Sequence, residues 1–245
     1  IAGPDSAETQ EQTIETALAA KEAGSTGLRG GAFKPRTSPY TFQGMGEEGL
    51  KLLRKAGDMV ELPIVTEVLD VEDLDLVCEY TDMIQIGARN MQNFPFLTAC
   101  AKTMKPIMLK RHYGASLRDW LGAAEYILLE GNNKLILCER GVSVPHTHRS
   151  TSRFLIDLQV VPALQEISHL PIVVDPSHAT FWRPWVPSLA KACVAVGSNG
   201  LMMEVHPKPK EAAVDPLQAI DYETFGSLVI QLKEIGKACN IDVGN

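Results

Sequence analysis

The chain has 245 residues, 45% of them hydrophobic and 22% charged, and its formal net charge is −7. This composition is typical of a globular protein, and the acidic balance argues against a general nucleic-acid surface. The sequence has no apolar run of about 18 residues, which a membrane span needs, and no recognisable signal peptide. Its five cysteines form no CxxC pair. We therefore expect a cytoplasmic protein with reduced, buried cysteines.

Short apolar runs recur along the chain, and each ends in a polar or charged cluster. They show almost no alternation of polar and apolar residues, which is typical of strands covered on both faces. We predict eight such strands: Ile1–Pro4, Gly27–Leu28, Leu62–Val65, Met83–Ile86, Pro106–Leu109, Leu135–Cys138, Pro171–Val174 and Gly200–Met203.

Segments with helical periodicity lie between and after these runs. They are Glu8–Ala23, Glu47–Ala56, Val71–Tyr80, Asn93–Lys102, Leu117–Leu129, Ile156–Ile167, Pro184–Val196 and Tyr222–Ala238. Alternating strands and helices in a chain of this length predict an α/β fold, a single (β/α)8 TIM barrel spanning residues 1–245 with no separate regulatory domain. The loops 32–46, 141–154 and 205–219 are long, and we expect them to border the active site at the carboxyl end of the strands.

Basic side chains gather near the ends of the middle strands. The set comprises Arg29, Lys34, Arg36, Arg89, Lys110, Arg111 and Arg140. Arginine binds phosphate or carboxylate through paired hydrogen bonds, and lysine supplies a point charge. Two clusters of cations indicate either two anionic substrates or one substrate that is anionic at both ends.

A second set joins carboxylates to one imidazole. Asp5 follows the first predicted strand, His178 the seventh and Glu204 the eighth, while Asp215 lies in the loop after the eighth. The first and eighth strands are neighbours in a closed barrel, so these side chains can meet. Three carboxylates and one nitrogen form a hard ligand set, which suits Mn²⁺, Fe²⁺ or Mg²⁺.

Longer motifs resemble a known family. They are the segments 30–40, 42–44 and 46–50, then Ile86-Gly87-Ala88-Arg89-Asn90, Leu137-Cys138-Glu139-Arg140-Gly141, Asp175-Pro176-Ser177-His178-Ala179 and Glu204-Val205-His206-Pro207. Over nearly the whole chain and in the same order, they resemble 3-deoxy-D-arabino-heptulosonate 7-phosphate (DAHP) synthases of the type Iβ group. That group also includes 3-deoxy-D-manno-octulosonate 8-phosphate (KDO8P) synthases, and the segment 34–38 favours the DAHP branch.

The resemblance implies a transferase that joins phosphoenolpyruvate to erythrose 4-phosphate in the first step of the shikimate pathway of aromatic amino-acid biosynthesis. It implies Lys110, Arg140 and His178 as catalytic residues, and a metal held by Asp5, His178, Glu204 and Asp215. Substrate contacts would come from Arg29, Lys34, Pro35, Arg36, Thr37, Ser38, Glu67, Arg89, Arg111, Glu139 and Arg153. It also implies a homo-oligomer, a dimer or a tetramer, with neither nucleic acid nor membrane as a partner.

Three departures from the family pattern leave alternatives open. Asp5 stands where metal-binding members carry cysteine, so a harder ion such as Mn²⁺ or Mg²⁺ should be preferred, or the protein works without metal. The loops after the fifth and sixth strands also differ, at residues 110–114 and 146–153. The alternatives are therefore the same phosphoenolpyruvate chemistry with another aldose phosphate, or a non-catalytic barrel that binds phosphorylated sugars.

Overall fold

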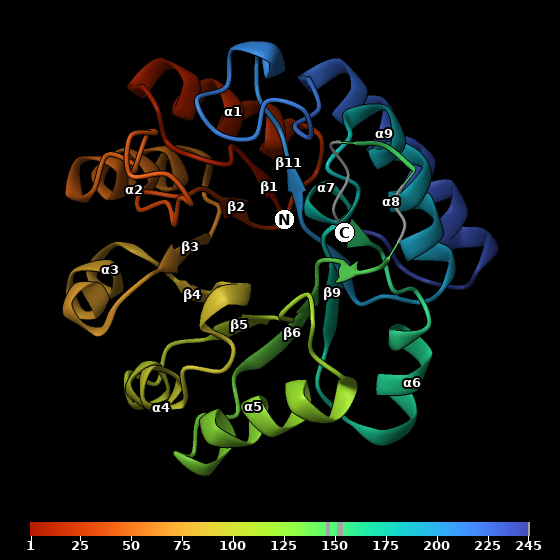
Figure 1. Cartoon of the computed structure of the whole chain (residues 1–245). Coiled ribbons are helices and arrows are strands. Elements are labelled where there is room, and N and C mark those ends of the chain that lie inside the picture. The colour runs from red at the N-terminus through yellow and green to blue at the C-terminus, as the bar shows by residue number, and fades with distance from the viewer. Residues whose placement is uncertain (146–147, 151–153, 245) are drawn as a thin grey trace.

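The computed structural model describes residues 1–145, 148–150 and 154–244. Its parallel strands follow one another around a ring that is surrounded by helices (Figure 1). The ring contains β1 (Ala2–Gly3), β2 (Leu28–Arg29), β3 (Ile64–Val68), β4 (Met83–Ile86), β5 (Ile107–Lys110), β6 (Leu135–Glu139), β9 (Ile172–Val174), β10 (Gly200–Leu201) and β11 (Met203–Glu204). The predicted barrel is confirmed.

The eighth predicted strand closes the ring in two pieces. β10 pairs with β9, and β11 pairs with β1. Met202 lies between them, and its N–H donates to the Val174 carbonyl (2.9 Å), whereas the N–H of Met203 donates to the Ile1 carbonyl (3.0 Å). One strand therefore bonds to both edges of the sheet, which brings the end of β11 beside the end of β1.

Side chains of the strands alternate between the inside of the barrel and the helical layer, because successive strand residues point to opposite faces. A small cluster of Val65, Met108, Cys138, Val173 and Met202 fills the interior. The outward residues next to them belong to the larger apolar layers beneath the helices. Because of this alternation, only every second residue of a strand can point its side chain toward the barrel mouth.

The outer helices are α1 (Gln10–Glu22), α2 (Glu47–Val60), α3 (Leu74–Tyr80), α4 (Phe94–Lys102), α5 (Leu117–Leu129), α6 (Val160–Ile167), α8 (Val186–Ala195) and α9 (Tyr222–Ala238), with a shorter helix α7 (Pro176–Thr180) after β9. Ser116 caps α5 as part of a capping box with Asp119. The helix predicted from Ile156 begins only at Val160, so Pro162 lies in its first turn, where proline is tolerated.

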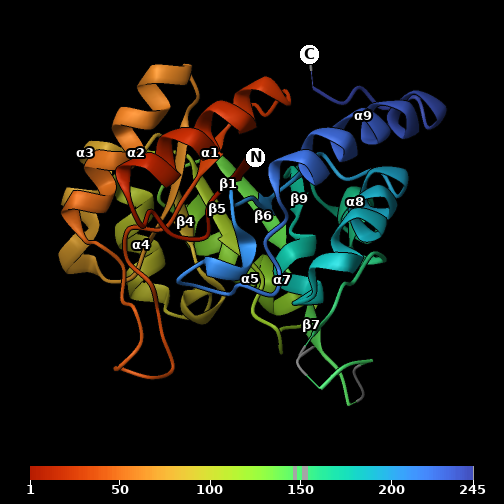
Figure 2. The ribbon, with the colours of Figure 1, turned by 90° about the horizontal axis from the view of Figure 1, so that it is seen from above.

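The long loops lie at the carboxyl end of the strands. In Figure 2 the segment between β2 and α2 and the hairpin β7 (Val142–Ser143) and β8 (Phe154–Leu155) extend from the same end of the barrel. Neither this antiparallel hairpin nor α7 was predicted from the sequence. Within the described residues, no helix combines the length and apolar character that crossing a membrane requires.

Candidate active site

A cavity of about 630 Å³ opens at the carboxyl end of the strands. Its lining includes thirteen of the predicted site residues: Asp5, Arg29, Lys34, Pro35, Arg36, Thr37, Ser38, Glu67, Arg89, Lys110, Arg140, His178 and Asp215. Three of the charged strand-end residues among them lie two positions beyond an inward apolar residue: Glu67 after Val65, Lys110 after Met108 and Arg140 after Cys138. The barrel geometry therefore brings together side chains from distant parts of the sequence.

The loop after β2 carries cations at two depths. Gly31 lets Lys34 fold back across the backbone, because a Cβ at Gly31 would lie 2.7 Å from Lys34 Cδ. Lys34 Nζ then donates to Asp5 Oδ1 (2.9 Å) at the buried floor. Nearer the rim, Arg36 Nε donates to Thr41 Oγ1 (3.3 Å) and Arg89 Nη1 to the Pro35 carbonyl (3.2 Å). The cavity thus offers positive charge both at its floor and at its mouth.

Oppositely charged groups alternate across the first half of the floor. Arg29 donates from both Nη atoms to Asp5 Oδ1, each at 3.1 Å, and its Nη1 lies 3.5 Å from Glu204 Oε1. Glu204 Oε1 in turn lies 3.2 Å from His178 Nε2. These contacts place Asp5, Glu204 and His178 in one buried group.

Beneath the other half of the floor lies the buried Asp175, which was not among the predicted site residues. Its Oδ2 accepts a hydrogen bond from Lys110 Nζ (2.7 Å) and lies 2.7 Å from His178 Nδ1. The strand period indicates this residue, since Asp175 lies two positions beyond the inward Val173. Asp175 therefore connects the lysine to the histidine.

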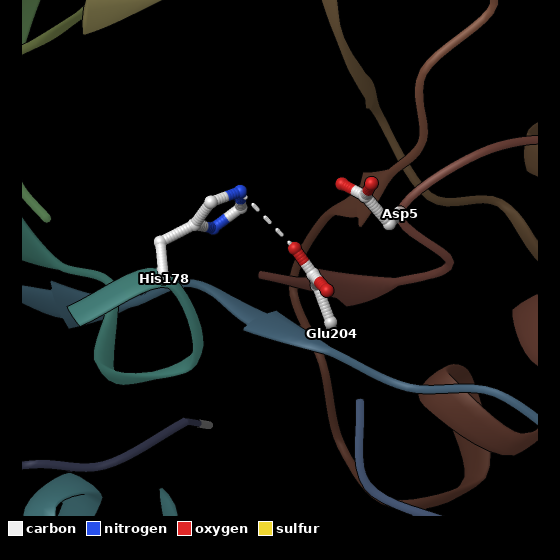
Figure 3. Close-up of side chains that lie close together, drawn as sticks. All are labelled: Asp5, His178 and Glu204. Carbon is white, nitrogen blue, oxygen red and sulfur yellow. Dashed lines mark ion pairs between the residues drawn. The ribbon is translucent and has the colours of Figure 1, made fainter. Parts of the chain in front are cut away.

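Asp5, His178 and Glu204 can hold a divalent ion. Each offers a ligand atom, and these atoms lie within 4.8 Å of one another. Figure 3 shows the Glu204 carboxyl group between the His178 ring and Asp5. Among the described residues, Asp5 Oδ2 and Glu204 Oε2 are buried and have no hydrogen-bond partner. Unpartnered buried oxygens beside an imidazole fit a cation site. Asp215, the fourth predicted ligand, lines the cavity but lies outside this group of three.

The burial and charges of this group shift its pKa values in different directions. Burial, together with the charge of Lys110, lowers the pKa of His178 to about 3 against the opposing pull of Asp175. Burial and the charge of Asp5 raise the pKa of Glu204. Burial also opposes ionisation of Asp5, but Lys34 and Arg29 outweigh it and lower the pKa of that carboxyl group. A neutral His178 has a nitrogen lone pair to offer a metal.

Gln218 is a further buried contact of this group. Its Nε2 donates to Glu204 Oε1 (2.8 Å), and its side chain is fully buried. Because it lies in an irregular segment after β11, neither strand nor helix periodicity indicates its position. The sequence offered no signal for this contact.

Arg111 and Glu139, which were predicted as substrate contacts, do not line the cavity. Arg111 Nη1 donates to Glu139 Oε2 (3.0 Å) and to Asp157 Oδ2 (2.8 Å). The reason is the strand period: each neighbours an inward residue, Lys110 or Arg140, and therefore points outward. Arg153 lies outside the described residues.

Comparisons with known proteins show the family of this chain. Residues 1–239 match the model of the DAHP synthetase I family. The chain belongs to this family. It is 47% identical over 243 residues to phospho-2-dehydro-3-deoxyheptonate aldolase of Thermotoga maritima, covering 99% of this chain and 71% of that protein. It is also 31% identical to 2-dehydro-3-deoxyphosphooctonate aldolase of Bordetella bronchiseptica, covering 95% of this chain and 88% of that protein.

Solved structures of family members share the fold. A crystal structure of the Thermotoga maritima DAHP synthase superposes with a TM-score of 0.94 at 46% identity, over 100% of this chain and 71% of that one. A truncated form of DAHP synthase from the same organism gives a TM-score of 0.90 at 43% identity, over 99% of this chain and 88% of that one. The chain thus corresponds to nearly the whole of the truncated family member.

Proposed function

We propose that this barrel condenses phosphoenolpyruvate with erythrose 4-phosphate to give DAHP and inorganic phosphate, the first step of the shikimate pathway. The observation that carries the proposal is a cavity with cations at floor and rim, in a chain 47% identical over 99% of its length to a phospho-2-dehydro-3-deoxyheptonate aldolase. In the reaction, the methylene carbon of phosphoenolpyruvate bonds to the aldehyde carbon. Water adds to the neighbouring carbon of phosphoenolpyruvate, and phosphate leaves.

The floor suits phosphoenolpyruvate. Lys110 is buried and Arg140 stacks on the Phe154 ring, with 4.5 Å from its guanidinium carbon to the ring centre. Together they would neutralise the carboxylate and phosphate and hold the substrate for attack. In this proposal Lys110 Nζ would also stabilise the oxyanion that forms from the aldehyde. Arg29, Lys34 and Arg89 would complete the phosphate contacts, and Glu67 faces the same space.

The rim suits the phosphate of erythrose 4-phosphate. Arg36, Thr37 and Ser38 line the mouth of the cavity, where they can donate hydrogen bonds to a terminal phosphate. Pro35 lies beside them and limits the conformations of the loop, which lowers the entropy cost of ordering it around a ligand. The proposal thus assigns the two substrates to different depths of one cavity.

Asp5, His178 and Glu204 would hold the metal, with Asp215 as a fourth ligand. When bound, the ion would act as a Lewis acid that polarises the aldehyde. Carboxylate is a harder ligand than thiolate, so we expect Mn²⁺ or Mg²⁺ to be preferred over softer ions. Metal-independent action is the competing proposal, and it is favoured by the contacts of Asp5 Oδ1 with both Arg29 and Lys34.

A different acceptor aldose is a second candidate function. Tyr113 and Phe154 line the cavity from the loops that depart from the family pattern, with ring centres 5.3 Å apart. Bulky rings at this position could change the accepted sugar length. Family resemblance also supports a dimer or tetramer and a cytoplasmic location, which sedimentation analysis and localisation of a tagged protein would test.

A phosphate-release assay over a panel of aldose phosphates, with and without Mn²⁺, tests these proposals together. We expect phosphate release from phosphoenolpyruvate to require an aldose phosphate and to be fastest with erythrose 4-phosphate. Faster turnover with another aldose would favour the second candidate. Binding of phosphoenolpyruvate without turnover of any aldose would favour a non-catalytic barrel, and full activity in metal-free protein would refute the metal assignment.

A further inference from the structure

We propose that Asp175 is a positioning residue that couples the anion-binding half of the site to its metal-binding half. The inference rests on the proposed function, because it assigns Lys110 to phosphoenolpyruvate and His178 to the metal. Asp175 is only 1% exposed and does not line the cavity. It would therefore act through the two residues that it contacts.

The Asp175 carboxylate is held in place from two directions. Its Oδ1 accepts the backbone N–H of His178 (3.0 Å), which makes Asp175 the N-cap of α7. Its Oδ2 accepts from Lys110 Nζ (2.7 Å) at the end of β5, which is separated from β9 by β6 alone. With one oxygen bound to the helix and the other to a strand-end lysine, the side chain has little freedom to rotate.

The same Oδ2 orients the imidazole. Asp175 Oδ2 lies 2.7 Å from His178 Nδ1, although Nδ1 has no hydrogen bond of regular geometry among the described residues. A lone pair on Nδ1 would repel the carboxylate at this distance, so a proton on Nδ1 is the favourable arrangement. The longer contact, 3.2 Å, is the one between Nε2 and Glu204 Oε1. His178 therefore keeps its proton on Nδ1 and turns the Nε2 lone pair toward Glu204 and Asp5, as metal-ligating histidines do.

Lys110 and His178 both contact Asp175 Oδ2, so anion binding and metal binding should depend on each other. When an anion draws Lys110 toward itself, more of the Asp175 charge acts on His178, which strengthens Nε2 as a ligand. Phosphoenolpyruvate should then tighten metal binding, and metal should tighten phosphoenolpyruvate binding by the same factor, because linkage is reciprocal. Losing the carboxylate should weaken metal binding directly and reduce this factor.

Asp175→Asn is the sharpest variant, because the asparagine oxygen can still cap α7 while its amide nitrogen cannot accept from Lys110 or His178. Asp221→Asn is the matched control. Asp221 caps α9 through the N–H of Thr224 (2.8 Å) and does not line the cavity. Circular dichroism and thermal unfolding would establish that both variants are folded.

Calorimetric titration with Mn²⁺ alone, phosphoenolpyruvate alone, and each in the presence of the other gives the test. We expect Asp175→Asn to raise the Kd for Mn²⁺ about 10- to 100-fold and to reduce the coupling factor, whereas Asp221→Asn matches the parent. Unchanged Mn²⁺ affinity and coupling in Asp175→Asn would overturn the inference. A parent protein that binds phosphoenolpyruvate but no Mn²⁺ would also overturn it, while leaving the proposed condensation intact.

A measurement on the parent protein keeps the inference testable if Asp175→Asn does not fold. Nitrogen NMR of the metal-free protein, with the His178 signals assigned by their loss in His178→Gln, reports which ring nitrogen carries the proton. We expect the proton on Nδ1. A proton on Nε2 alone would contradict the positioning role, whether or not the protein catalyses the proposed reaction.

Discussion

Two buried ionic clusters are built around adjacent residues, Lys110 and Arg111, but lie on opposite faces of the sheet. Inside the barrel mouth, Lys110 pairs with Asp175; outside it, Arg111 pairs with Glu139 and Asp157. The remaining polar atoms of the outer cluster are hydrogen-bonded to nearby backbone. Arg111 Nε donates to the Ala115 carbonyl (3.0 Å), and Glu139 Oε1 accepts the N–H of Gly141 (2.7 Å).

The inner cluster differs because polar atoms remain without partners. Among the described residues, buried Asp5 Oδ2 and Glu204 Oε2 have no hydrogen-bond partner, whereas no side-chain atom of Arg111 or Glu139 is in that state. Unpartnered polar atoms cost stability unless a ligand completes them. We therefore propose that the inner charges serve binding and catalysis, and that the outer charges hold the fold.

Breaking the outer cluster should have the largest effect of these substitutions, and the effect should be a loss of stability. Arg111→Met leaves Glu139 buried without its cationic partner, which should reduce the free energy of unfolding by about 3–5 kcal/mol. Denaturant unfolding measures this loss. The folded fraction should keep near-parental kcat/KM, and the double variant Arg111→Met/Glu139→Gln should recover part of the stability. A large loss of kcat/KM without destabilisation would return Arg111 to the active site.

Removing an inner cation should instead affect catalysis. Lys110→Ala should cost about 2–4 kcal/mol of transition-state stabilisation, which is about 30- to 1,000-fold in kcat/KM for phosphoenolpyruvate. Arg140→Ala should act similarly, because Arg140 lines the same cavity. Steady-state kinetics on the folded variants measure both effects, and near-parental values would remove these residues from the site.

A substitution at the rim should affect the KM of one substrate more than that of the other. Arg36→Ala should raise the KM for erythrose 4-phosphate about 10- to 100-fold, since a charge-assisted hydrogen bond contributes about 1.5–3 kcal/mol, and should change the KM for phosphoenolpyruvate far less. Arg118→Ala, on the exposed start of α5, is the control. Equal increases for both substrates would contradict the assignment of this loop.

Metal affinity should depend on pH through Glu204. Burial and Asp5 raise the pKa of Glu204, and a metal needs the ionised carboxylate, so lowering the pH should weaken Mn²⁺ binding. His178, with its pKa lowered to about 3, stays neutral over the same range and should not contribute. Calorimetric titrations from about pH 8 to about pH 5 measure this trend; affinity that rises as pH falls would contradict it.

The sequence predicted the barrel and most of the cavity, because strand-end residues converge wherever parallel strands close into a ring. Arg111 and Glu139 lie outside the cavity, contrary to expectation, because their nearness to strand ends was considered without the alternation of side chains. That alternation would also have indicated Asp175. Gln218 and the β7–β8 hairpin could not be predicted, since their positions depend on contacts between loops distant in sequence.

Comparing Lys110→Ala with Arg111→Met, adjacent residues on one strand end, tests the central claim most directly. For each variant, erythrose 4-phosphate-dependent phosphate release and the free energy of unfolding would be measured on the same preparation. We expect Lys110→Ala to lose the activity as a folded protein, and Arg111→Met to lose stability while its folded fraction remains active. Activity retained in Lys110→Ala, or lost in a fully stable Arg111→Met, would contradict the division between an inner catalytic cluster and an outer structural one.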